Sequence, residues 1–167
     1  MKNIYIRKLE KDDWKLFRAM RIEMVTHNPE CFLESADQAK SRPDERWISE
    51  LSNPKNALFM LYNKELPVGF AGNFHFGEMK DHEREIGMLY VNPRYRGNNF
   101  ALQLVNFCLD YALADKSISH MGIGHRRNNN ASKSVILRCG FIPIGEIEYI
   151  FGNGEKDISL KYEKIIR

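Results

Sequence analysis

Residues 85–101 read EIGMLYVNPRYRGNNFA, and the rest of the chain is interpreted around them. The stretch opens with a run from Ile86 to Val91 that has the length and composition of a buried strand. Asn92 and Pro93 then form a turn signal, and a helical pattern begins near Asn99. We therefore predict a strand, a tight basic loop and a helix in direct succession.

The loop between this strand and this helix has the features of an anion site. Arg94, Arg96 and Gly97 stand where the chain leaves the strand, and the next helix points its N-terminus at them. The first N–H groups of a helix lack intrahelical partners and carry partial positive charge. Together with two guanidinium groups they predict a seat for a phosphorylated ligand. The plainer alternative is that Arg96, Asn98 and Asn99 form only a helix cap on a solvated turn.

The composition favours one globular domain and argues against several functional classes. The chain of 167 residues has the length of a single domain, and its net charge of +3 is far from the basic balance of nucleic-acid-binding proteins. No apolar run approaches roughly 18 residues, so we expect no membrane association. Cys31, Cys108 and Cys139 lack metal-ligand spacing, so we expect no metal site. With no signal peptide pattern at the N-terminus, these features predict a cytoplasmic location.

The first third of the chain is interpreted as one strand and two helices. Alternating apolar residues predict a strand from Lys2 to Leu9. An aspartate at position 12 or 13 then caps a helix that ends near His27. The segment from Glu30 to Arg42 shows little periodicity and is expected to be a loop, after which a second helix opens at Pro43.

The middle of the chain predicts an antiparallel meander followed by a crossover. The strands 57–62 and 67–76 precede the central strand and are joined by short polar connections. A helix over 99–114 is apolar nearly all round, which indicates a mostly buried helix. The strand 118–123 follows it, and because a whole helix separates this strand from the central one, a parallel βαβ crossover is favoured.

The last third adds a short helix and a hairpin. A helix over 131–139 ends at Gly140, and the strands 141–151 and 156–162 flank a glycine-rich turn. The full order is β-α-α-β-β-β-α-β-α-β-β. It predicts a single α/β domain over residues 1–167, with a mixed, mostly antiparallel sheet, a central parallel βαβ pair and flanking helices.

With these elements placed, two motifs resemble the GNAT superfamily of acetyl-CoA-dependent N-acetyltransferases, and the resemblance spans nearly the full chain. The family's loop pattern, Gln/Arg-x-x-Gly-x-Gly/Ala before a helix, falls on Arg96-Gly97-Asn98-Asn99-Phe100-Ala101. Asn99 stands where the family usually has glycine, and asparagine is among the residues that best tolerate a positive φ. The second motif is Asn129-Asn130-Ala131-Ser132 with the later Gly140-Phe141, which looks like the start and the end of the family's next helix.

The resemblance implies acetyl-CoA as the cofactor and assigns residues to it. The central strand would splay from its neighbour near Met88, so that main-chain groups of the following residues pair with the pantetheine arm. These residues are Leu89, Tyr90 and Val91. The pyrophosphate would lie on the loop formed by Arg96, Gly97, Asn98, Asn99, Phe100 and Ala101. Asn129 and Ser132 would contact the cofactor from the next helix, although helix capping is the plainer role for Asn129.

Transfer to an amine also requires a base, because an alkyl ammonium with a pKa near ~10 must first lose a proton. Glu85 is our candidate, since some family members keep a glutamate at the matching place that acts through water. Strict alternation would put Glu85, Gly87 and Leu89 on one face of the strand. His75 on the neighbouring strand is a second candidate. The plainer interpretation of Glu85 is a solvated strand end.

The general acid is left unassigned. Many relatives carry a tyrosine in the helix before Gly-Phe, whereas this sequence has Ile136, which cannot donate a proton. Tyr149 is one replacement to consider, but no spacing argument places it.

The sequence leaves the acceptor and the class of activity open. We expect a small-molecule or peptide amine as acceptor, and Glu30, Glu34 and Asp37 in the predicted loop would draw a cationic amine. The plainer alternative is that these three carboxylates only face water. An exposed strand in the last hairpin would let two copies pair as a homodimer. A CoA-binding module without turnover is the alternative function, because the usual tyrosine and glycine are missing. A phosphate-binding domain for other nucleotides is disfavoured, because both glycine-rich nucleotide motifs are absent.

Overall fold

The computed structural model describes residues 3–167, and the predicted strand start at Lys2 lies outside them. The helices are α1 (Trp14–His27), α2 (Ala36–Ser41), α3 (Asp44–Ser52), α4 (Phe100–Ala114) and α5 (Asn130–Arg138). The strands are β1 (Ile4–Lys8), β2 (Ala57–Asn63), β3 (Leu66–Phe74), β4 (Glu83–Val91), β5 (His120–Arg126), β6 (Ile142–Ile150) and β7 (Lys156–Ile165). Short 3-10 turns, Lys11–Asp13 and Pro93–Tyr95, precede α1 and follow β4.

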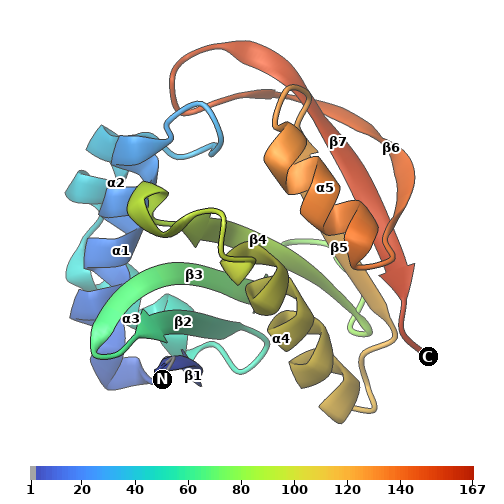
Figure 1. The fold of residues 1–167 in the computed structure, drawn as a ribbon, viewed down its shortest axis with the longest axis horizontal. Coiled ribbons are helices and arrows are strands. Elements are labelled where there is room, and N and C mark those ends of the chain that lie inside the picture. The colour runs from blue at the N-terminus through green and yellow to red at the C-terminus, as the bar shows by residue number, and fades with distance from the viewer. Residues whose placement is uncertain (1–2) are drawn as a thin grey trace.

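The described strands form one seven-stranded sheet in the order β1-β2-β3-β4-β5-β7-β6 (Figure 1). The neighbours β4 and β5 are parallel, and the other neighbouring pairs are antiparallel. The helix α4 connects the two parallel strands, as expected for a βαβ crossover. The predicted fold class is therefore confirmed. Strand β7 inserts between β5 and β6, which leaves β6 at the edge of the sheet.

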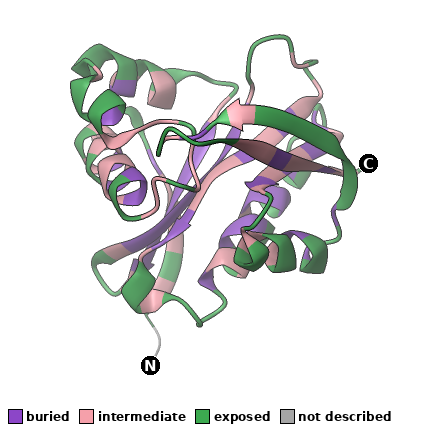
Figure 2. Cartoon of the chain, turned by 90° about the horizontal axis from the view of Figure 1, so that it is seen from above, coloured by how far each residue is buried: buried purple, intermediate pink, exposed green. Residues whose placement is uncertain are grey.

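Helices cover both faces of the sheet, and the buried residues concentrate between the layers (Figure 2). On one face, Phe17 of α1 and Trp47 of α3 pack with Phe70 and Phe74 of β3. On the other face, side chains of α4 and α5 pack with β2, β3, β4 and β5. We call these the α1 face and the α4 face. Burial of such apolar surface stabilises the fold by roughly 25 cal/mol for each Å² removed from water.

Two predictions about helices are wrong in part. The segment predicted as a loop contains α2, which begins with a capping box: the Ser35 hydroxyl accepts the Gln38 N–H and the Gln38 side chain accepts the Ser35 N–H. Its single turn and a half is too short to show a period in the sequence. Helix α4 is buried along one side only, since Tyr111 and Leu113 are 39% and 46% exposed. Apolar residues all round a helix therefore did not mean burial all round.

Strand β4 carries a bulge and parts from β5 halfway along its length. The pattern in the sequence predicts Glu85 at the start of this strand. The strand begins at Glu83, so Glu85 is its third residue. The parallel pairing with β5 runs from Glu83–His120 to Ile86–Ile123 and then stops, while β5 continues along β7. Two residues, Met88 and Leu89, then stand opposite one residue of β3, and Met88 has a φ of 57°. The sheet thus opens between β4 and β5, as the resemblance implied.

Within residues 3–167, no helix is long and apolar enough to cross a membrane. In the same range, no three histidine, cysteine or acidic side chains are arranged to hold a metal ion. Cys31, Cys108 and Cys139 are free thiols.

Candidate active site

A cavity of about 610 Å³ lies where β4 and β5 part. It is walled by the end of β4, the start of α4, the end of β5, the first turns of α5, the α1–α2 loop and the β6–β7 hairpin. Most residues predicted for the site line it. They are Glu85, Leu89, Tyr90, Val91, Arg96, Gly97, Asn99, Phe100, Ala101, Asn129 and Ser132. Asn98 is not among the lining residues, because its side-chain amide turns back to donate to the Tyr95 carbonyl at 2.9 Å.

The loop between β4 and α4 presents unpaired main-chain N–H groups. From Gly97 to Leu102, no N–H meets a protein acceptor within the described residues, whereas the Gln103 N–H bonds to the Asn99 carbonyl at 3.0 Å. Gly97 has a φ of 82° and Asn99 a φ of 60° with a ψ of 23°. Asparagine therefore adopts here the left-handed conformation that glycine would take. Free amides at the start of a 15-residue helix fit a pyrophosphate group.

Arg96 is placed differently from our expectation. Its Nε donates to the Val91 carbonyl at 2.9 Å and its Nη2 donates to Asn28 Oδ1 at 2.6 Å, so that it ties the end of β4 to the end of α1. Arg94 is exposed and does not line the cavity. The two guanidinium groups therefore do not converge on the loop, and the candidate anion site is formed by main-chain groups.

Asn129 has the capping role that was the plainer expectation. Its Oδ1 accepts the Ser132 N–H at 3.2 Å, which satisfies one of the free donors at the start of α5. Its Nδ2 also lies 3.6 Å from Cys31 Sγ, across the cavity wall from the α1–α2 loop. Burial is the main cause that raises the pKa of the Cys31 thiol to about 11, so this thiol is protonated at neutral pH.

The bulge in β4 changes which residues share a face. Ile86, Leu89 and Val91 pack on the α4 face, whereas Met88 and Tyr90 pack on the α1 face. Glu85 and Gly87 alternate with Ile86 and so belong to the α1 face. The prediction that Leu89 shares their face is therefore wrong, because the extra residue at the bulge reverses the alternation.

Glu85 is held by a residue that the sequence reasoning missed. Lys161 of β7 donates to Glu85 Oε1 at 3.0 Å, and both side chains line the cavity. The same Lys161 Nζ lies 5.4 Å from the centre of the Tyr149 ring, which also lines the cavity. His75, the second candidate base, does not line the cavity and stands 4.0 Å from Asp81. Lys161 reaches the site because β7 pairs with β5 in a register that places Lys161 opposite Gly124. The sequence alone does not give this register.

A second charged group lies on the α1 face and was also missed. Arg21 of α1 and Arg42, just before α3, both donate to Glu34, and Arg42 donates to Glu50 at 2.8 Å. Arg21, Arg42 and Glu50 line the cavity. Burial lowers the pKa of Arg21 and raises the pKa of Glu50, since both side chains are largely withdrawn from water. We call Arg21, Glu34, Arg42 and Glu50 the charged cluster.

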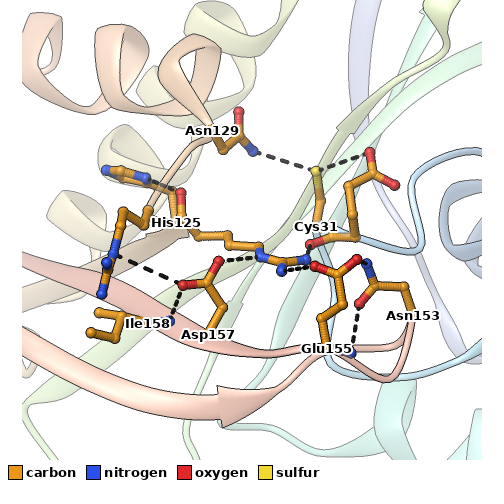
Figure 3. Close-up of polar contacts among 10 residues, drawn as sticks. Cys31, His125, Asn129, Asn153, Glu155, Asp157 and Ile158 are labelled. Carbon is orange, nitrogen blue, oxygen red and sulfur yellow. Dashed lines mark hydrogen bonds and ion pairs between the residues drawn. The ribbon is translucent and has the colours of Figure 1, made fainter.

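The α1–α2 loop is joined to the β6–β7 turn across one side of the cavity (Figure 3). Arg126 at the end of β5 donates to Asp157 at 2.8 Å, to Glu155 at 2.7 Å and to the Glu30 carbonyl at 3.0 Å. The hydrogen bond to Arg126 is the main cause that lowers the pKa of Asp157. The Gly152 N–H also donates to the carbonyl of residue 32 at 2.7 Å. These contacts, which we call the bridge, hold two walls of the cavity together.

The sheet opens between two parallel strands, and helix-start N–H groups without protein acceptors in the described residues lie beside the opening. The model of the Acetyltransferase (GNAT) family matches residues 19–141. The chain belongs to the GNAT acetyltransferase family, and its cofactor is acetyl-CoA. No curated protein matches the chain in sequence.

Solved structures with the same fold are distant in sequence. A ribosomal-protein-alanine N-acetyltransferase from Brucella melitensis is 19% identical, with a TM-score of 0.79 over 97% of this chain and 99% of that one. A putative acetyltransferase from Salmonella typhimurium with its cofactor acetyl-CoA is 14% identical, with a TM-score of 0.78 over 98% and 94%. A spermidine N-acetyltransferase from Vibrio cholerae, in complex with CoA and spermine, is 16% identical, with a TM-score of 0.73 over 97% and 95%. These likenesses show the fold.

Proposed function

We propose that this protein is an N-acetyltransferase that moves the acetyl group of acetyl-CoA directly to a primary amine. The observation that carries the proposal is a run of N–H groups, from Gly97 to Leu102, that have no protein acceptor within residues 3–167 and border the same cavity as Glu85. The amides suit the anionic end of the cofactor, and the carboxylate suits an amine that must lose a proton. The free state of all three cysteines supports a cytoplasmic location as part of this proposal.

The chain's own residues have the following roles in this proposal. The loop from Gly97 to Ala101 binds the pyrophosphate, and main-chain groups of residues 89–91 orient the pantetheine arm in the gap beside β5. The bound cofactor supplies the activated acetyl group. Lys161 holds the Glu85 carboxylate in place, and Glu85 takes the proton of the amine, directly or through one water. As the new N–C bond forms, the C–S bond breaks and the departing thiolate needs a proton.

Tyr149 is the donor we propose for that proton. Ile136 is fully buried and has no proton to give. The hydroxyl of Tyr90, the other tyrosine among the lining residues, lies 2.7 Å from His27 Nδ1, and burial raises the pKa of this phenol. The Tyr149 hydroxyl has no partner within the described residues, and its ring lies beside Lys161. A free phenol next to the base suits a donor to a thiolate.

The test combines calorimetry of CoA binding with thiol release from acetyl-CoA across a panel of amines. Glu85→Gln should lower kcat by about 100-fold or more while CoA affinity stays unchanged, because one positioned base contributes 10² to 10⁴. Glu83→Gln in the same strand is the matched control, since that carboxylate accepts the Lys80 N–H outside the cavity. Absence of CoA binding by the wild-type protein would overturn the proposal, and full activity of Glu85→Gln would remove the assigned base.

The alternative is a CoA-binding module without turnover. It is favoured by Ile136, which replaces the usual donor, and by the ion pair that already engages Glu85. Tight CoA binding with no thiol release for any amine would support it, whereas one good acceptor would exclude it.

The homodimer stays a prediction. Strand β6 is the edge strand through which it would form, and this strand exposes Ile142, Ile144, Ile147 and Ile150.

A further inference from the structure

Both carboxylates of the charged cluster are engaged by arginine, and the one cluster oxygen without a hydrogen-bond partner within residues 3–167, Glu34 Oε1, is buried. Glu34, one of the acidic residues expected to do so, accepts from both Arg21 and Arg42 and is only 14% exposed. Glu50 accepts from Arg42 at 2.8 Å. The two carboxylates of the charged cluster are therefore each paired with arginine. Asp37 lies in the first turn of α2 and does not line the cavity.

One arginine of the cluster, Arg21, by contrast has a donor left over. Arg21 makes one contact to Glu34, at 3.3 Å, and its Nε is buried without a partner within residues 3–167. A buried donor without a partner is costly, and an oxygen atom of a ligand would satisfy the guanidinium. Arg42 lies 4.2 Å above the Trp47 ring, which fixes the plane of its guanidinium. Two guanidinium groups at one cavity wall, that of Arg42 held in a fixed plane and that of Arg21 with an unused donor, suit a carboxylate ligand.

The charges around the acceptor end are balanced. In the charged cluster and the Glu85 ion pair, three cationic side chains pair with three anionic ones, Arg21, Arg42 and Lys161 with Glu34, Glu50 and Glu85. The other lining arginines, Arg96 and Arg126, are engaged by protein acceptors on the far sides of the cavity. A ligand with a large net charge would disturb this balance in a poorly solvated site. A zwitterionic ligand has no net charge and so keeps this balance, provided that its carboxylate contacts the arginines and its amine contacts Glu85.

The rest of this end of the cavity is apolar, and one side is closed. The apolar lining residues are Phe32, Leu33, Phe74, Phe76, Met88 and Phe151. They suit an acceptor with an apolar body. On the side of the α1–α2 loop, the bridge brings Gly152 N within 2.7 Å of the Phe32 carbonyl, so no extended polypeptide passes between these walls. The site therefore favours a small molecule over a protein tail.

From these observations we infer that the acceptor is a small amino acid with an apolar side chain, whose carboxylate binds Arg21 and Arg42. Its amine then points to Glu85, which lies on the same α1 face of β4. This inference rests on the proposed acetyltransferase function and narrows it to one class of substrate. A polyamine or a protein N-terminus lacks the carboxylate next to the amine that this arrangement requires.

The test compares acids with their amides in the full-length protein saturated with CoA. L-phenylalanine and L-leucine are titrated by calorimetry beside L-phenylalaninamide and L-leucinamide, which keep the amine and the side chain. We expect at least one acid to bind about 10-fold or more tightly than its amide, as one charge-assisted contact is worth that factor. Arg21→Lys and Arg42→Gln should abolish the difference. Arg46→Gln, at an exposed position of α3, should keep it.

Each result separates the inference from the function on which it rests. Equal or tighter binding of the amides, binding of neither acid nor amide, or unchanged selectivity in Arg21→Lys and Arg42→Gln would each overturn the inference. The wild-type comparison of acid with amide decides the matter if a variant fails to fold. Thiol release with spermidine or a peptide, but with no amino acid, would overturn the inference and leave the proposed function standing. Selective binding of the acid without thiol release would support the site and refute the acetyltransferase.

Discussion

The left-handed conformation of Asn99 makes a quantitative prediction about the cofactor loop. Asn99 has a φ of 60° and a ψ of 23°, and the free N–H groups of the loop follow from this geometry. Valine at this position is strongly disfavoured, because its branched Cβ clashes in the left-handed region. We expect Asn99→Val to cost about 1–2 kcal/mol. Asn99→Gly should cost nothing in strain, because glycine adopts this conformation freely.

The cost must appear in one of two measurements. If the loop of Asn99→Val keeps its shape, the strain lowers the free energy of unfolding, and Tm falls by roughly 2–8 °C for a chain of this size. If the loop relaxes to another shape, CoA must restore it, and CoA binding weakens by roughly 5- to 30-fold. Differential scanning calorimetry and titration of CoA distinguish the two cases. The 3.5 Å contact of Asn99 with Arg138 is too long to contribute much.

Two comparisons guard this reasoning. Asn99→Gly also removes the side chain, so any effect that it shares with Asn99→Val is not strain. Gln103→Val places the same valine at an exposed position of α4 and controls for helix propensity. An Asn99→Val protein with wild-type Tm and wild-type CoA affinity would refute the claim that this φ positions the loop.

Cys31→Ser should retain full acetyl transfer and show no acetylated protein by intact mass, because burial raises the thiol pKa to about 11 and direct transfer needs no cysteine; loss of turnover would contradict direct transfer. Gly152→Ala should lower Tm by several degrees and expose the α1–α2 loop to proteases, since its Cβ would lie 2.6 Å from the Glu34 carbonyl oxygen; an unchanged melting curve would speak against a tight bridge. Arg7 lowers the pKa of Asp13, so Asp13→Asn should lower stability at pH 7 by about 1 kcal/mol. A carboxyl group whose pKa is lowered by folding stabilises the folded state above about pH 4, and this stabilisation is lost as the pH falls and the carboxylate is protonated. The difference in Tm between wild type and Asp13→Asn should therefore vanish near pH 2; a difference that stays constant with pH would be inconsistent with the ion pair.

Local signals were sufficient for the backbone of the cofactor side. The succession of strand, loop and helix around Arg96 was readable because apolar runs, Asn-Pro and a helix start are all encoded within a few residues. The resemblance placed a glycine position at residue 99, and asparagine is tolerant of the positive φ that the structure shows there. The parallel pairing of β4 with β5 followed from the helix between them, because a tight turn joins only antiparallel strands.

The missed features depend on contacts between segments far apart in the sequence. The bulge at Met88 inserts one residue into β4, and Met88 has a φ of 57°. Methionine has no preference for a positive φ, so the residue type did not predict this bulge. It reversed the predicted face of Leu89. Lys161 reaches Glu85 only through the register of β7 on β5. Glu34 looked like a solvated carboxylate, because its partners Arg21 and Arg42 lie on two different segments.

The early end of the pairing between β4 and β5 has a consequence for how the molecule holds together. Among the described residues, four strand-paired residue pairs between β4 and β5 connect β1–β4 with the group β5–β7–β6. The sheet therefore consists of two halves that are paired over a short length. Beyond Ile86 and Ile123, the described main-chain groups of β4 and β5 that face each other across the gap have no strand partner. An extended ligand bound between β4 and β5 would hydrogen-bond to both strands and so join the two halves of the sheet. The stability of the fold would then increase with the fraction of protein that has this ligand bound.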